Sequence, residues 1–106
     1  MAKYLWQAKY STEGMHGLLK DGGTGRKAAV EQAVASLGGT LECMHYAFGE
    51  HDVYIIVDLP DNVSAAALAF TVAASGAVRV TTTVLMTPEE VDEATHKSVQ
   101  YRAPGA

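Results

Sequence analysis

Residues 48–61 read Phe-Gly-Glu-His-Asp-Val-Tyr-Ile-Ile-Val-Asp-Leu-Pro-Asp, which is the pattern of a β-strand bounded by two turns. The glycine permits the backbone angles of a tight turn. Val53, Ile55 and Val57 then alternate onto one face of an extended strand. Pro60 has no N–H to donate to a β-ladder and ends the strand. This stretch therefore predicts a hairpin partner before it and a helix after it.

The rest of the chain is divided into elements by signals of the same kind, since apolar residues alternate in some segments and recur at helical spacing in others. Gly38 and Gly39 predict a left-handed helix cap, and Asp61 or Asn62 is the predicted cap of the helix that follows the quoted stretch. Thr87 to Glu90 predict a capping box with proline at the first helical position. The first half of the chain is predicted to form a strand over residues 3–10, a short helix that starts at Ser11 or Thr12 and breaks at 21–25, and a second helical piece from Arg26 to Leu37. A strand over 40–48 follows and precedes the strand of the stretch quoted above. The second half is predicted to form a helix over 63–75, a strand over 77–86 and a helix from 88 to about 98.

Strict alternation on the second predicted strand assigns its residues to two faces. Leu41, Cys43 and His45 share one face, and Met44 and Tyr46 lie on the other. If the first of these faces lies under the helices, His45 points into the interior.

The order β-α-β-β-α-β-α consists of two split βαβ halves. It predicts an α+β fold, a ferredoxin-like βαββαβ sandwich with one extra C-terminal helix. Helices on one side of such a sheet leave its other face bare, and large apolar groups on both faces of the strands favour a cover for it. Because a second copy of the chain is the least demanding cover, we expect a homodimer with the two sheets face to face.

Size and composition limit the kind of protein. For 106 residues we expect a single domain over residues 1–100 and a flexible tail over 101–106. A formal charge of −4 argues against nucleic acid as a partner, since phosphate binding needs clustered Lys and Arg. Cys43 is the single cysteine and no long apolar region opens the chain, so a cytoplasmic protein is expected. Polar residues interrupt the longest apolar stretches, which argues against a membrane span.

Several motifs resemble the GYD-domain family of small bacterial proteins, and the resemblance spans nearly the whole chain. The motifs are Thr12-Glu13-Gly14 followed by Arg26, Leu37-Gly38-Gly39, the turn and strand Gly49-Glu50-His51-Asp52-Val53, and Leu59-Pro60-Asp61-Asn62. Gly49, Asp52 and Arg26 match the family's pattern, whereas His51 stands where the family's name motif has tyrosine. The resemblance implies a dimeric α/β-barrel architecture and gives little chemistry.

His45 and Asp52 are the candidate catalytic residues. If a reaction occurs, His45 is the expected proton shuttle and Asp52 its helper, because a carboxylate can orient an imidazole. The alternative for Asp52 is structural, with its carboxylate accepting hydrogen bonds from backbone amides of the turn. The sequence leaves both roles open, and it does not decide whether the protein is an enzyme.

Four further residues are candidate ligand-binding residues. Trp6 and Tyr46 can form pocket walls, because aromatic side chains supply contact area together with a polar group. Arg26, at a predicted helix start, can reach a ligand carboxylate, although a solvated arginine is the commoner outcome. His16 completes the set, and the predicted pocket lies between sheet and helices, lined by Trp6, His16, His45, Tyr46 and Asp52.

A metal or haem site is a weaker alternative. Glu13 and His16 have the spacing that brings two side chains to one helix face, and His45 can meet them if its strand face lies under the helices. Neither a His-Glu-x-x-His motif nor a cysteine pair supports such a site. No metal ligand is therefore assigned, and the cofactor is unknown.

The sequence thus favours a homodimer that binds a small aromatic or carbonyl metabolite in this pocket, and it leaves open whether the metabolite is also transformed. The alternative, apart from a metal or haem module, is a non-catalytic oligomeric assembly protein. That alternative is motivated by the alanine-rich helix over 63–75, because small residues allow helices to pack closely.

Overall fold

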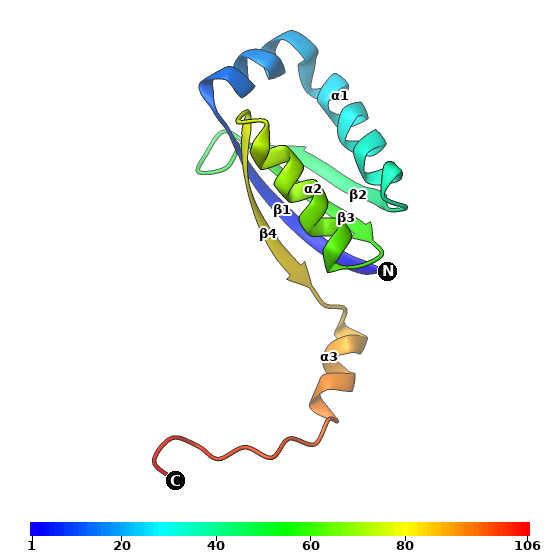
Figure 1. Ribbon diagram of the computed structural model, residues 1–106, viewed down its shortest axis with the longest axis vertical. Coiled ribbons are helices and arrows are strands. Elements are labelled where there is room, and N and C mark those ends of the chain that lie inside the picture. The colour runs from blue at the N-terminus through cyan, green and yellow to red at the C-terminus, as the bar shows by residue number, and fades with distance from the viewer.

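The computed structural model describes residues 1–106 and contains one sheet of four antiparallel strands, with the two longer helices on one of its faces (Figure 1). The elements are β1 (Ala2–Tyr10), α1 (Thr12–Ser36), β2 (Thr40–Tyr46), β3 (Val53–Leu59), α2 (Asn62–Ala74), β4 (Val78–Leu85) and α3 (Pro88–Thr95). The strand order across the sheet is β2-β3-β1-β4. This confirms the predicted α+β ferredoxin-like sandwich with an additional C-terminal helix.

Strand β1 lies in the interior of the sheet and supplies the centre of the core. It pairs antiparallel with β3 and β4, so that Trp6 lies opposite Ile55 on one side and Thr82 on the other. Alternate strand residues pack under the helices, where burying one large aliphatic side chain contributes up to about 1.5–3 kcal/mol. The buried apolar core comprises Tyr4, Trp6, Ala8, Val34, Val53, Ile55, Val57, Leu59 and Ala65.

Helix α1 is kinked by a single glycine. Ser11 caps the start of the helix, and its side chain accepts a hydrogen bond from the N–H of Gly14. The break predicted over residues 21–25 is confined to Gly22, with φ of 76° and ψ of 166°. Glycine suits these angles because a side chain there would strain the backbone. The two halves of α1 consequently run in different directions (Figure 1), and α1 packs against β2.

Strand β2 contains a β-bulge between Leu41 and Cys43. Leu41, before the bulge, and Met44, after it, both pack against the core. His45 follows Met44 directly and therefore points to the opposite face of the sheet. Cys43 and His45 share a face as predicted, but the placement of Leu41 on that face is wrong, because one extra residue shifts the alternation of all that follow it.

Side-chain caps fix the starts of α2 and α3. Asp61 caps α2 by accepting a hydrogen bond of 2.8 Å from the N–H of Ser64, and Gly76 follows the end of the helix with φ of 74°. Thr87 and Glu90 form the predicted capping box of α3 through reciprocal hydrogen bonds of 2.9 and 3.1 Å. The predicted starts of both helices are thereby confirmed.

The face of the sheet away from α1 and α2, called the bare face below, carries both charged and apolar groups. Lys3 crosses it, with Nζ 2.7 Å from Glu42 Oε2 and 3.1 Å from Asp58 Oδ1. These two carboxylates raise the pKa of Lys3 above its usual value, Glu42 more than Asp58. Leu5 and Ile56 lie opposite each other on the same face.

Helix α3 projects beyond the end of the sheet, and the residues after it extend farther from the body (Figure 1). Residues 96–106 form no helix or strand, and α3 has no buried residue. None of the helices is both long and apolar enough to cross a membrane.

Candidate functional site

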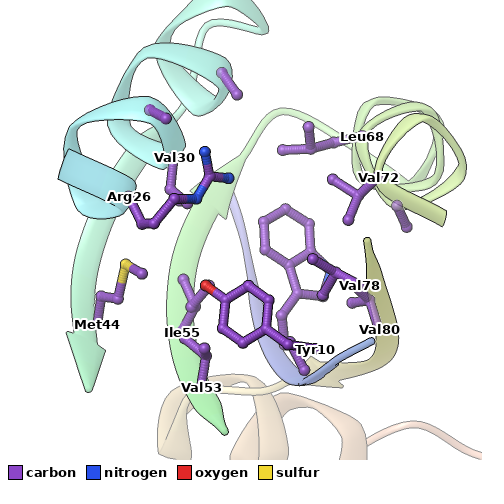
Figure 2. Close-up of a pocket in the computed structure, with 15 residues that line it drawn as sticks. Tyr10, Arg26, Val30, Met44, Val53, Ile55, Leu68, Val72, Val78 and Val80 are labelled. Atoms are coloured by element: carbon purple, nitrogen blue, oxygen red, sulfur yellow. The ribbon is translucent and has the colours of Figure 1, made fainter. Parts of the chain in front are cut away.

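A cavity of about 120 Å³ lies between the sheet and the two helices, in the place where the sequence predicted a pocket (Figure 2). All four strands and both α1 and α2 contribute to its wall. Of its 15 lining residues 14 are hydrophobic, and the exception is Arg26. An apolar cavity with very few polar groups is the usual form of a small-molecule site.

Trp6 contributes a buried polar atom to this wall. It projects from β1 and is 4% exposed. Its indole Nε1 is buried and has no hydrogen-bond partner. A buried donor without an acceptor costs about 1–3 kcal/mol, so few are found in native proteins. The indole therefore lines the cavity with its apolar surface, while its N–H is enclosed by the chain without an acceptor.

Arg26 and Tyr10 form the polar side of the cavity. Arg26 extends from α1 over the cavity, and Tyr10 enters it from the end of β1 (Figure 2). The ion pair of Arg26 with Asp21 spans 3.8 Å from Nη1 to Oδ2, which is longer than a hydrogen bond. The guanidinium is therefore available to a ligand.

Tyr46 stands next to this polar side but does not line the cavity. Its hydroxyl donates a hydrogen bond of 2.9 Å to the carbonyl of Gly23, which joins β2 to α1 beside the kink. Burial raises the pKa of Tyr46, Tyr10 raises it further, and Arg26 acts in the opposite direction. Tyr46 lines instead a second, more open hollow, together with Asp52.

Asp52 ties the start of β3 to the end of β1. Its side chain is 10% exposed, and Oδ2 accepts a hydrogen bond of 3.0 Å from the backbone N–H of Tyr10, while Oδ1 lies 3.3 Å from Lys9 Nζ. Its own N–H donates to the carbonyl of Ala8 at 2.8 Å. The carboxylate of Asp52 therefore accepts a hydrogen bond from a backbone amide, as the structural alternative predicted. That amide belongs to the neighbouring strand β1 and not to the turn.

The histidines of the predicted site do not reach the cavity. His16 is exposed on α1, and His45 is exposed on the bare face because of the bulge in β2. No group of three or more His, Cys, Asp or Glu side chains is positioned to hold a metal ion. The structure does not bring His45 and Asp52 together in the cavity, so the role of His45 as a proton shuttle stays a prediction.

Two of the predicted ligand-binding residues, Trp6 and Arg26, do line the cavity, and Tyr10 was missed. Tyr10 continues the alternation of Trp6 along β1, so the sequence contains the signal that it faces inward. Its position beside Arg26 depends on the kink at Gly22, which no alternation pattern can show.

The GYD domain family model matches residues 4–95, a range that includes residues of every strand and every helix. No curated protein and no solved structure matched the chain. Because the matched range covers most of the 106 residues, this chain belongs to the GYD domain family.

Proposed function

We propose that the protein acts as a homodimer and binds a small aromatic or carbonyl metabolite in the cavity between sheet and helices. The observation that carries the proposal is the composition of the cavity wall. The wall is apolar except for Arg26, and Trp6 lines it with an aromatic ring.

The wall matches the two parts of such a metabolite. Aliphatic side chains and the indole of Trp6 offer contact to an apolar or aromatic body. A carbonyl oxygen offers an acceptor to Arg26, whose ion pair with Asp21 is longer than a hydrogen bond. Binding would thus remove water from an apolar surface and satisfy a donor at the same time.

The single tryptophan makes the cavity directly observable. We expect the fluorescence of Trp6 to change saturably on titration with phenylacetamide or phenylacetate, two aromatic compounds that carry a carbonyl group. Ala33→Leu fills space at the cavity wall and should abolish the response. Ala35→Leu, at an exposed position on the same helix, is the matched control and should preserve it.

Circular dichroism of both variants verifies that they remain folded. The proposal fails if neither compound gives a saturable response with the wild-type protein. It also fails if Ala33→Leu and Ala35→Leu respond alike, because the binding site would then lie elsewhere.

A second candidate function, assembly into a larger oligomer, is favoured by the outer face of α2. Val63 and Phe70 on this helix are 78% and 72% exposed, and Ala67 and Ala74 continue the same face at helical spacing. Helix α2 contains no charged residue. Exposed apolar patches of this kind mark contact sites.

The assembly candidate predicts a species larger than a dimer in native mass spectrometry. Phe70→Glu places a charge in the outer face of α2 and should reduce that species to a dimer. A wild-type protein that forms no such species would contradict this candidate.

A further inference from the structure

We infer that the ligand is a carboxylate, a small anion with an aromatic or branched aliphatic body whose carboxylate binds Arg26. The inference rests on the proposed function, since it names the class of molecule that the cavity takes. It is carried by the kinds of hydrogen-bonding group that the wall presents.

The polar groups at the cavity are almost entirely donors. The guanidinium of Arg26 has five N–H groups and accepts no hydrogen bond. Tyr10 adds a hydroxyl that can do either. The wall contains no carboxylate, imidazole or amide side chain. A complementary ligand must therefore bring acceptors, and the charge of Arg26 favours acceptors that are negative.

Arg26 is free to take such a ligand. Its distance of 3.8 Å from Asp21 is too long for a hydrogen bond, and the two side chains are 35% and 46% exposed. Ion pairs exposed to this degree contribute little. A ligand carboxylate can accept two parallel N–H bonds from the guanidinium, which is the geometry that arginine provides and lysine does not.

The nearby buried carboxylate does not oppose an anion in the cavity. Asp52 is absent from the cavity wall. Its Oδ1 lies 3.3 Å from Lys9 Nζ, and its Oδ2 accepts from the N–H of Tyr10. The charge of Asp52 is thereby balanced locally, and Arg26, which is only loosely paired with Asp21, is the charge that an entering ligand meets.

Phenylacetate and phenylacetamide test the inference, because they have nearly the same shape and differ in charge. From the strength of hydrogen bonds to charged groups, we expect the wild-type protein to bind phenylacetate about ten- to hundredfold more tightly. Arg26→Gln should remove this preference, and Arg26→Lys should retain part of it. Lys27→Gln removes an adjacent exposed charge of the same sign and should leave the preference unchanged.

The outcomes separate this inference from the function on which it rests. Equal affinity of the wild-type protein for both compounds overturns the inference and leaves the proposed function standing. Binding of neither compound overturns the proposed function itself. A preference that survives in Arg26→Gln also overturns the inference, because another cation then selects the anion. If Arg26→Gln fails to fold, an undiminished preference in Arg26→Lys contradicts the bidentate contact.

Discussion

At position 52 the chain places a carboxylate where a strand-to-strand hydrogen bond would otherwise lack an acceptor. Asp52 is buried. Its side chain accepts a hydrogen bond from the N–H of Tyr10, and its own N–H donates one to the carbonyl of Ala8. Three residues are thus held together at one end of the sheet, next to the polar side of the cavity. The carboxylate contributes to the shape of the site through Tyr10.

Asp52→Ala should lower the free energy of unfolding by about 1–3 kcal/mol, because the N–H of Tyr10 is left without a partner. Asp52→Asn retains an acceptor oxygen and should lower the free energy of unfolding by less than Asp52→Ala does. Urea denaturation followed by circular dichroism measures both changes. Equal losses in the two variants would show that the charge facing Lys9 matters more than the acceptor.

Asp61 predicts a dependence of stability on pH. The hydrogen bond from the N–H of Ser64 lowers the pKa of Asp61 below its ordinary value of 3.8. A lowered pKa in the folded state gives a stabilisation that is complete above the unfolded pKa and is lost as the pH falls through the folded one.

Asp61→Asn keeps a capping oxygen and removes the titration. The difference in the free energy of unfolding between the wild-type protein and this variant should therefore be constant near neutral pH and become smaller below pH 3.8. Denaturant unfolding across that range measures it, with Asp92→Asn as the control for loss of one exposed acid. An advantage that grew on acidification would contradict the assignment.

Single residues were predictable from the sequence where their environment is local. Trp6 lies on an uninterrupted alternating strand, so its inward direction follows from spacing alone. Asp61 precedes a helix and caps it. The sequence left open which face His45 takes, because a bulge three residues earlier depends on pairing with β3, and that pairing is not encoded in the strand's own pattern.

Among the helices, α1 offers two glycines with opposite expected effects. An added Cβ at Gly17 or at Gly22 meets nothing within 4 Å, so packing does not distinguish them. Gly17→Ala should stabilise the protein by about 0.5–1 kcal/mol, because alanine loses less entropy in a helix. Gly22→Ala should destabilise it by about 1–3 kcal/mol, because of its φ of 76°.

Thermal and urea unfolding of the two variants measure this difference in sign. A neutral Gly22→Ala variant would show that the kink is not needed for folding. The Gly17→Ala variant controls for the general effect of adding a methyl group to α1.

Thr87→Ala should unwind α3 without changing global stability. Loss of an N-cap costs about 0.5–2 kcal/mol, and an isolated helix shorter than about 12 residues is marginal in water. Hydrogen exchange of the amides of Glu90 and Val91 should therefore accelerate. Asp61→Ala, which uncaps the core-packed helix α2, should lower global stability instead. A global loss in Thr87→Ala would show that α3 packs on something in solution.

The elements themselves were predicted well because their signals are glycine, proline and capping residues. The break in α1 was predicted over five positions and occupies one. Three further residues after Gly22 remain helical because the second half of α1 packs on the sheet, and tertiary packing overrides the low helix propensity of glycine. The cavity between the helices could be expected from the fold, but its polar side depends on where the kink places Arg26.

At the scale of the whole molecule, the proposed homodimer is tested on the bare face. Leu5 and Ile56 lie opposite each other there. Ile56→Lys places a charge where two sheets would meet, so the dimer should dissociate while the cavity on the other face remains. Sedimentation equilibrium measures the mass, and Ala35→Lys, at an exposed position on α1 outside both proposed contact faces, is the control. A wild-type protein with the mass of one chain would contradict the dimer.

The projecting α3 and the residues after it change how one chain moves through water. The Cα radius of gyration is 16.9 Å, whereas a compact domain of this length has about 13 Å. Such an elongated particle experiences more friction than a sphere of equal mass. A single chain would elute early from a gel-filtration column, where it could pass for a dimer, so elution volume is a poor guide to subunit number for this protein.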